Sequence, residues 1–254
     1  MKIFKLIGIV LLLSGCASQG GGSEGTPQDA SSRAQAIAKI HTELAASYFE
    51  RKQYGIALQE IDIALQSESG FAPAFTVRGL IRMALREDDK ADEDFPRSLQ
   101  LDKKDSSAHN NYGLFLCTRG REKESVTQFL EAVKNPLYAT PEAAYVNAGT
   151  CSKKIGKLKE AEEYFQRALI RQPNSAEALY GLADLSFIAQ DFAGAKSYYL
   201  RFIQRSPELT AENLWLAVRI ERKIGDRNSE QSYALQLRKR FPDARETQLL
   251  LKGE

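Results

Sequence analysis

The chain has 254 residues, of which 43% are hydrophobic and 27% are charged, a composition typical of a folded domain that buries its own core. Lys and Arg number 35 and Asp and Glu number 33, so the net charge is only +2. A nucleic-acid binder needs a basic excess to neutralise phosphates. Two His and three Cys leave little material for metal or nucleophile chemistry. Composition therefore argues against nucleic-acid binding and against most enzyme classes.

The first residues have the pattern of a secretory signal. Lys2 and Lys5 precede a run of apolar residues from Leu6 to Leu13 that contains a single glycine. A run of this length is too short to span a bilayer, which needs about 20 residues. A basic start, a short apolar run and small residues after it are typical of a secretory signal peptide. We therefore predict that residues 1–15 form a signal peptide.

The signal ends in Leu13-Ser14-Gly15-Cys16, which resembles a bacterial lipobox. In that motif a signal peptidase cuts before the cysteine, and the thiol receives a diacylglycerol. The alternative is an ordinary signal peptide followed by a chance cysteine. Residue 17 is Ala rather than Asp, which by resemblance to enterobacterial sorting favours the outer membrane. Cys16 is thus the expected lipidation site, and the expected location is the periplasmic face of the outer membrane.

A segment rich in Gly and Ser follows the expected anchor. Residues 17–32 read ASQGGGSEGTPQDASS and contain no large apolar side chain. Sequences of this kind behave as flexible chains. We predict a flexible linker over residues 16–33, including the lipidated cysteine.

Two small residues recur through the rest of the chain with nearly constant spacing. The first series is Ala45, Gly79, Gly113, Gly149, Ala183 and Ala217. The second series is Ala57, Ala91, Ser125, Ala161, Ala195 and Ser229. Steps within both series are about 34 residues, and a bulky residue follows each member of the second series by one helical turn. The pattern resembles the tetratricopeptide repeat, in which paired antiparallel helices approach each other closely at small residues.

The expected fold is all-α, a right-handed superhelical solenoid of six tetratricopeptide repeats over residues 34–243. The repeats are placed at about 38–71, 72–105, 106–139, 142–175, 176–209 and 210–243. Two extra residues before Pro141 predict a longer loop between the third and fourth repeats. Residues 244–254 are expected to cap the last repeat, because a terminal repeat otherwise exposes an apolar face. Gln236 stands where the sixth repeat should have a small residue.

The two histidines and the two cysteines beyond Cys16 fit structural roles better than catalytic ones. His41 and His109 occupy equivalent positions in two repeats, which favours packing or hydrogen bonding. Cys117 and Cys151 lie in first helices of adjacent repeats, so they form a disulfide in an oxidising compartment, remain two buried thiols, or join His109 in a metal site. Phosphate-binding glycine loops and nucleophile motifs are absent from the sequence. We therefore predict no enzyme activity, no cofactor, no metal, no nucleic-acid partner and no small-molecule substrate.

Repeat solenoids usually bind a partner along their concave face, which the first helix of each repeat lines. The equivalent positions of the first helices in repeats one to three predict an apolar strip on this face, formed by Phe49, Leu80, Met83 and Leu114. An exposed strip of this kind favours peptide binding, unless neighbouring side chains or the linker cover it. The candidate groove residues are Thr42, Ala46, Phe49, Thr76, Leu80, Met83, Asn110 and Leu114.

Three local segments indicate which family of tetratricopeptide-repeat proteins the sequence resembles. They are Ile40-His-Thr-Glu-Leu-Ala45, Asn110-Asn-Tyr-Gly-Leu-Phe115 and Ala234-Leu-Gln-Leu-Arg-Lys-Arg-Phe-Pro242. Together with the lipobox, linker and six repeats, they resemble the PilF/PilW family of type IV pilus biogenesis lipoproteins. The resemblance implies a pilotin, an outer-membrane lipoprotein that binds secretin subunits (PilQ-like) and promotes their localisation and multimer assembly. The alternative is a periplasmic scaffold lipoprotein of general outer-membrane protein assembly.

Overall fold

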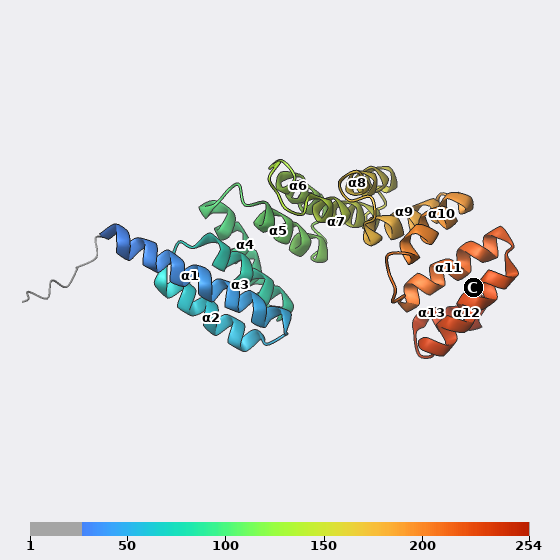
Figure 1. Cartoon of the computed structure of the whole chain (residues 1–254), viewed down its shortest axis with the longest axis horizontal. Coiled ribbons are helices and arrows are strands. Elements are labelled where there is room, and N and C mark those ends of the chain that lie inside the picture. Colours follow the sequence, from blue (N-terminus) through green and yellow to red (C-terminus); the bar gives the residue numbers. More distant parts are fainter. Residues whose placement is uncertain (1–26, 254) are drawn as a thin grey trace, which may run out of the picture.

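A computed structural model describes residues 27–253. Across that range it contains thirteen helices and no strand, so the prediction of an all-α repeat solenoid is confirmed. The helices are α1 (Pro27–Glu50), α2 (Tyr54–Ser67), α3 (Ala72–Ala84), α4 (Asp88–Leu101), α5 (Ser106–Thr118), α6 (Glu122–Ala132), α7 (Pro141–Lys154), α8 (Leu158–Arg171), α9 (Ala176–Ile188), α10 (Phe192–Ile203), α11 (Ala211–Ile224), α12 (Arg227–Arg240) and α13 (Arg245–Leu251). Figure 1 shows successive helix pairs following one another along a curved path, with α1 and the C-terminus at opposite ends.

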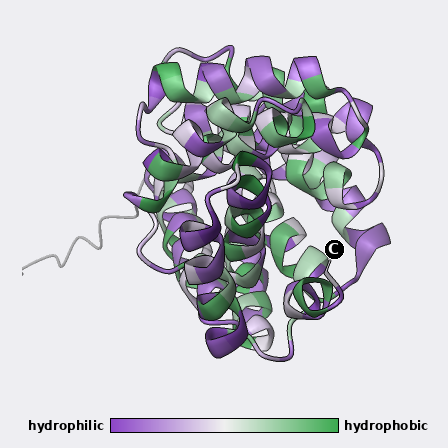
Figure 2. Cartoon of the chain, turned by 90° about the vertical axis from the view of Figure 1, so that its right-hand side faces the viewer, coloured by the Kyte–Doolittle hydropathy of each residue, from purple (hydrophilic) through white to green (hydrophobic). Residues whose placement is uncertain are grey.

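Each repeat is one antiparallel helix pair, from α1–α2 to α11–α12. The second helix of a repeat also packs against the first helix of the next repeat. Apolar residues therefore have to lie on two sides of most helices. Coloured by hydropathy, the helices show hydrophobic and hydrophilic sides, as expected for amphipathic helices in such a stack (Figure 2).

The recurring glycines fit against aromatic rings. A Cβ atom on Gly113 would lie 2.6 Å from the ring of Phe129, and one on Gly149 would lie 2.8 Å from the ring of Phe165. Gly181, in the following repeat, also approaches the Phe165 ring, where a Cβ would lie 2.5 Å away. The ring therefore occupies volume that any larger residue at these positions would need. This close packing explains the 34-residue spacing of small residues.

Two parts of the chain differ from the sequence prediction. Residues 27–33 were expected in the linker but form the first turns of α1, which is ten residues longer than the next-longest helices. Ala30, Ala34 and Ala36 favour a helix there, and extending an existing helix gains about one hydrogen bond per residue without a new nucleus. The predicted linker before residue 27 lies outside the described residues, as do the signal peptide and Cys16.

The sixth repeat buries a different set of residues from the one that its register predicts. Ala234 and Leu237 are buried in α12, whereas Gln236 is only half-buried. The reason is α13, whose Leu249 and Leu250 pack with Ala234 and Leu237 in one cluster. That cluster also covers α11, so residues 245–251 close the C-terminal end of the solenoid.

Candidate partner-binding groove

A groove of about 650 Å³ lies across the first helices of repeats one to three. Its lining residues come from α1, α3, α5, the start of α2 and the turns after α3 and α5: Phe49, Tyr54, Leu80, Met83, Ala84, Arg86, Asn111, Leu114, Thr118 and Arg119. The stacking of helix pairs places these side chains together although they span about 70 positions of the sequence.

The floor of the groove is apolar and rests on a packed core. Leu80 and Met83 pack against the cluster that contains Phe95 and Phe115. Phe49 and Tyr54 lie with their ring centroids 5.9 Å apart. Leu114 is 37% exposed, so a substantial part of its side chain faces solvent. Because the underlying cluster is buried, the floor is a preformed surface on which apolar side chains of a partner can be buried.

Polar groups also line the groove. Arg119 pairs with Asp88, with a guanidinium nitrogen 2.7 Å from a carboxylate oxygen, and it also lies over the ring of Phe115. Arg86 occupies a backbone conformation with φ of 63° at the turn after α3. Asn111 and Thr118 add an amide and a hydroxyl. An apolar floor beside fixed polar groups suits an amphipathic protein segment, because the polar groups can orient what the floor buries.

The structure brings four of the eight predicted groove residues together: Phe49, Leu80, Met83 and Leu114. Thr42 and Thr76 do not line the groove because both are buried. The Thr42 hydroxyl donates to the Ala38 carbonyl at 2.7 Å, and the Thr76 and Ser98 hydroxyls share a hydrogen bond of the same length.

Ala46 and Asn110 are partly exposed but are not part of the groove lining. The Asn110 side-chain oxygen accepts a hydrogen bond from the amide of Asn147, 3.0 Å away in the next repeat. Tyr54, Arg86 and Arg119 are groove residues that the sequence analysis did not single out. Tyr54 begins α2, and Arg86 and Arg119 lie in inter-helix turns. The register of the first helices does not predict the direction of such side chains.

The two remaining cysteines are joined. Cys117 of α5 and Cys151 of α7 form a disulfide with their Cα atoms 6.0 Å apart. Cys151 is completely buried, and it belongs to the cluster that contains Phe129 and Ala148. The bond therefore connects the third and fourth repeats beside the groove.

Reduction of this disulfide is expected to destabilise the protein by about 4 kcal/mol, because the bond closes a 34-residue loop. In a thermal melt this corresponds to a decrease of about 10 °C in Tm. The matched control is a Cys117→Ala/Cys151→Ala variant, which should melt at one temperature with or without reductant. Equal melting temperatures for the reduced and oxidised wild-type protein would contradict the prediction.

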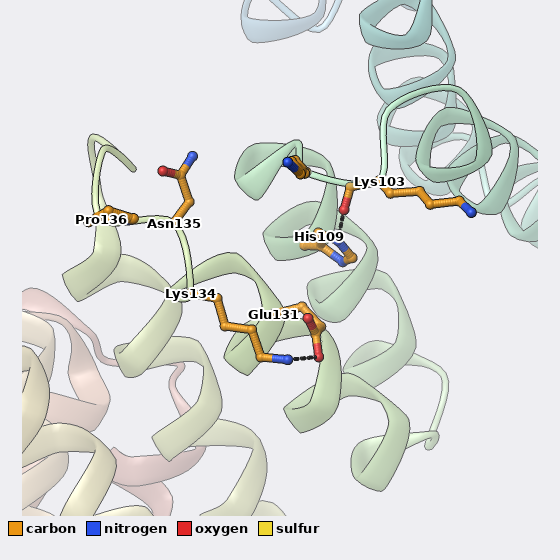
Figure 3. Close-up of a pocket in the computed structure, with 7 residues that line it drawn as sticks. Lys103, His109, Glu131, Lys134, Asn135 and Pro136 are labelled. Carbon is orange, nitrogen blue, oxygen red and sulfur yellow. Dashed lines mark hydrogen bonds and ion pairs between the residues drawn. The ribbon is translucent and has the colours of Figure 1, made fainter.

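A second, polar cleft of about 400 Å³ lies on the third repeat (Figure 3). Lys103, Lys104, His109 and Lys134 line it, and Lys134 pairs with Glu131. The His109 ring is held at both nitrogens, by Gln128 at 2.7 Å and by the Lys103 carbonyl at 3.1 Å. His41 occupies the equivalent position and contacts Glu60 at 2.6 Å. Both histidines thus connect the helices of their own repeats.

Within residues 27–253, no three His, Cys, Asp or Glu side chains lie close enough to hold a metal ion. A search of the same residues for an apolar helix long enough to cross a bilayer finds none. The fold and groove define a helical-repeat protein of the kind that binds other proteins. Residues 153–209 match the family model of the tetratricopeptide repeat.

The chain is also similar along most of its length to individual proteins. It is 27% identical over 236 residues to the type IV pilus assembly protein PilF of Pseudomonas aeruginosa, covering 93% of this chain and 92% of that protein. The crystal structure of PilW, described as a widely conserved type IV pilus biogenesis factor, has a TM-score of 0.78 and 34% identity. That similarity covers 85% of this chain and 98% of PilW.

The solved structure of Pseudomonas aeruginosa PilF has a TM-score of 0.81 at 26% identity and covers 87% of this chain and 100% of that one. The chain belongs to the PilF/PilW family of tetratricopeptide-repeat proteins of type IV pilus biogenesis. The family was already indicated by the three local segments quoted above, and the comparisons confirm it.

Proposed function

We propose that this protein is an outer-membrane lipoprotein, anchored through Cys16, that binds the type IV pilus secretin and promotes its multimer assembly. Homology to PilF and PilW supports a role in pilus biogenesis. The observation that carries the proposal is the preformed apolar groove of repeats one to three. Such a groove suits binding of a protein segment.

The groove supplies the binding energy in this mechanism. Phe49, Leu80, Met83 and Leu114 bury apolar side chains of a secretin segment, and each 100 Å² of apolar area removed from water contributes about 2.5 kcal/mol. Asn111 and Arg119 at the rim orient the segment. Repeated helix pairs keep the floor rigid, so little ordering is required when the partner binds.

In this mechanism the lipid on Cys16 keeps the groove close to the outer membrane. Cys16 lies 11 residues before the start of α1, and a chain of that length reaches at most about 40 Å. The groove is then confined near the membrane, where the secretin must insert. Confinement raises the effective concentration of both partners, so a modest affinity of the groove is sufficient.

The decisive experiment compares cells with and without this protein for detergent-resistant secretin multimers in the outer-membrane fraction. We expect the multimers to disappear while total secretin and other outer-membrane proteins stay at their normal level. Normal multimers in the correct membrane would contradict the proposal. A general loss of outer-membrane proteins would instead support the broader scaffold function.

A further inference from the structure

The first repeat exposes a group of large aliphatic side chains at the end of the solenoid. These residues, here termed the end face, are Ile40 (56% exposed), Leu44 (41%), Ile56 (42%) and Ile63 (39%). Ile40 and Leu44 are four residues apart on α1, and Ile56 and Ile63 are seven apart on α2, so each pair lies on one side of its helix. Figure 1 shows α1 and α2 at one end of the chain.

The two stripes face the same way, outward from the solenoid. His41 of α1 and Glu60 of α2 contact each other at 2.6 Å, and each belongs to the side of its helix that carries the exposed aliphatic residues. Leu58 and Leu65, on the other side of α2, pack into the core with Ala74 and Ile81 of α3. The end face is therefore directed away from the second repeat.

Repeats two to five do not expose large aliphatic side chains at these positions, and repeat six does so at one of them, Leu235 (59% exposed), which corresponds to Ile63. At the position of Ile40, repeats two to five have an alanine, buried beneath the preceding helix pair: Ala74, Ala108, Ala144 and Ala178. Repeat six has the exposed Glu212 there. At the positions of Ile56 and Ile63, repeats two to four have charged residues: Lys90, Glu124 and Glu160 for the first, and Arg97, Glu131 and Arg167 for the second. The first repeat is thus the one among the six that exposes an aliphatic side chain at all four of these positions.

The end face is not shaped like an ordinary repeat interface. Internal first helices use alanine so that the preceding helix can approach closely, whereas Ile40 projects into that space. At the opposite end, α13 covers the last repeat through Leu249 and Leu250, but residues 27–253 provide no such cap for the first. A deformable apolar surface fits the end face better than another rigid helix pair.

Two carboxylates near the end face have a basic partner. Glu43 lies 4.0 Å from Lys39, and Glu60 contacts His41. Pairing lowers the cost of bringing these carboxylates toward a medium of low dielectric constant. For these two carboxylates the partner reduces the electrostatic cost of approaching an apolar medium.

We propose that the end face docks onto the lipid bilayer, with its four aliphatic side chains at the boundary between headgroups and acyl chains. This inference rests on the proposed lipid anchor, because Cys16 is only 11 residues before α1 and α1 is part of the end face. Interfacial binding by apolar side chains adds a second membrane contact to the lipid. The anchored protein then has a fixed orientation, with its groove at a defined height above the membrane.

The test uses the full lipidated protein in vesicles of phosphatidylethanolamine and phosphatidylglycerol, with an environment-sensitive fluorophore on one introduced cysteine. Cys16 carries lipid and the other two cysteines form a disulfide, so Leu44→Cys or Ile56→Cys provides one reactive thiol. Ile170→Cys is the matched control, because Ile170 is 78% exposed on α8, far from the end face. Spin-labelled lipids should quench the probes at 44 and 56 about twofold more than the probe at 170.

Flotation of the vesicles separates failure of the anchor from failure of docking. Protein that does not float contradicts both the lipid anchor and the inference built on it. Floating protein with equal quenching at positions 44, 56 and 170 overturns docking but leaves the anchor intact. The third outcome is a blue shift of the fluorophore emission at position 44 or 56 that spin-labelled lipid does not quench and that increases with the number of protein molecules per vesicle. It would show that the end face contacts a second copy of the protein, which also overturns docking on lipid.

Discussion

A Leu114→Asp substitution is expected to abolish secretin multimers in the outer membrane while the protein remains folded. Leu114 is 37% exposed in the floor of the groove, so a carboxylate there stays hydrated in the free protein. Binding of an apolar segment would remove that hydration. Losing a central contact of an interface typically costs 2 kcal/mol or more, which weakens binding by at least about 30-fold. Fractionation followed by detergent-resistant gel analysis measures the multimers.

The control for this experiment is Leu158→Asp. Leu158 has the same 37% exposure but lies at the start of α8, away from the groove, where an aspartate is favourable to the helix. Circular dichroism should show unchanged helicity for both variants. Wild-type multimer levels with Leu114→Asp would exclude the groove as the secretin site, and equal loss with Leu158→Asp would show that the effect is not specific to the groove.

Replacing Phe165 with Ala is expected to destabilise the protein by about 3–5 kcal/mol, among the largest effects of any single substitution. The ring is 2% exposed and lies between Gly149 of its own repeat and Gly181 of the next. Its removal leaves a cavity in two repeats at once, and neither glycine has a side chain that could fill it. Chemical denaturation followed by circular dichroism measures the free energy of unfolding.

A double-mutant cycle makes this prediction specific. In the wild-type protein, Gly149→Ala should be destabilising, because its Cβ would lie 2.8 Å from the Phe165 ring. In the Phe165→Ala background the same change should be stabilising, because the methyl group enters vacated space and alanine favours a helix by about 0.5–1 kcal/mol over glycine. Additive effects would show that ring and glycine do not share this volume.

The repeat architecture was predictable because it depends on volume at regular intervals. Gly113, Gly149 and Ala183 recur with the period of the helix pairs, and the bulky partners Phe129 and Phe165 follow at fixed distances. The cap was predictable for a similar reason, since an apolar terminal repeat must be covered. The details of repeat six were not, because burial of Leu237 in place of Gln236 depends on where α13 packs.

The groove was only half predictable. Helical register placed Phe49, Leu80, Met83 and Leu114 on one surface, and the structure brings them together. The same register included Thr42 and Thr76, which are buried because close packing of α1 and α3 with neighbouring helices encloses that side. Tyr54 at the start of α2 and Arg119 in the turn after α5 complete the groove. Their direction is decided by how the helices on either side of each turn pack.

The sequence by itself determined the helix-pair period, the positions of close approach, the family and the chemistry available, since these depend on residue type and spacing. Only the tertiary structure decided that α1 begins at Pro27, that Cys117 and Cys151 are joined, and that Ile40, Leu44, Ile56 and Ile63 share one end that no other part of residues 27–253 covers. The physical reason is that burial and exposure belong to the stack of repeats. The same helical position is core when another repeat lies over it and surface when none does.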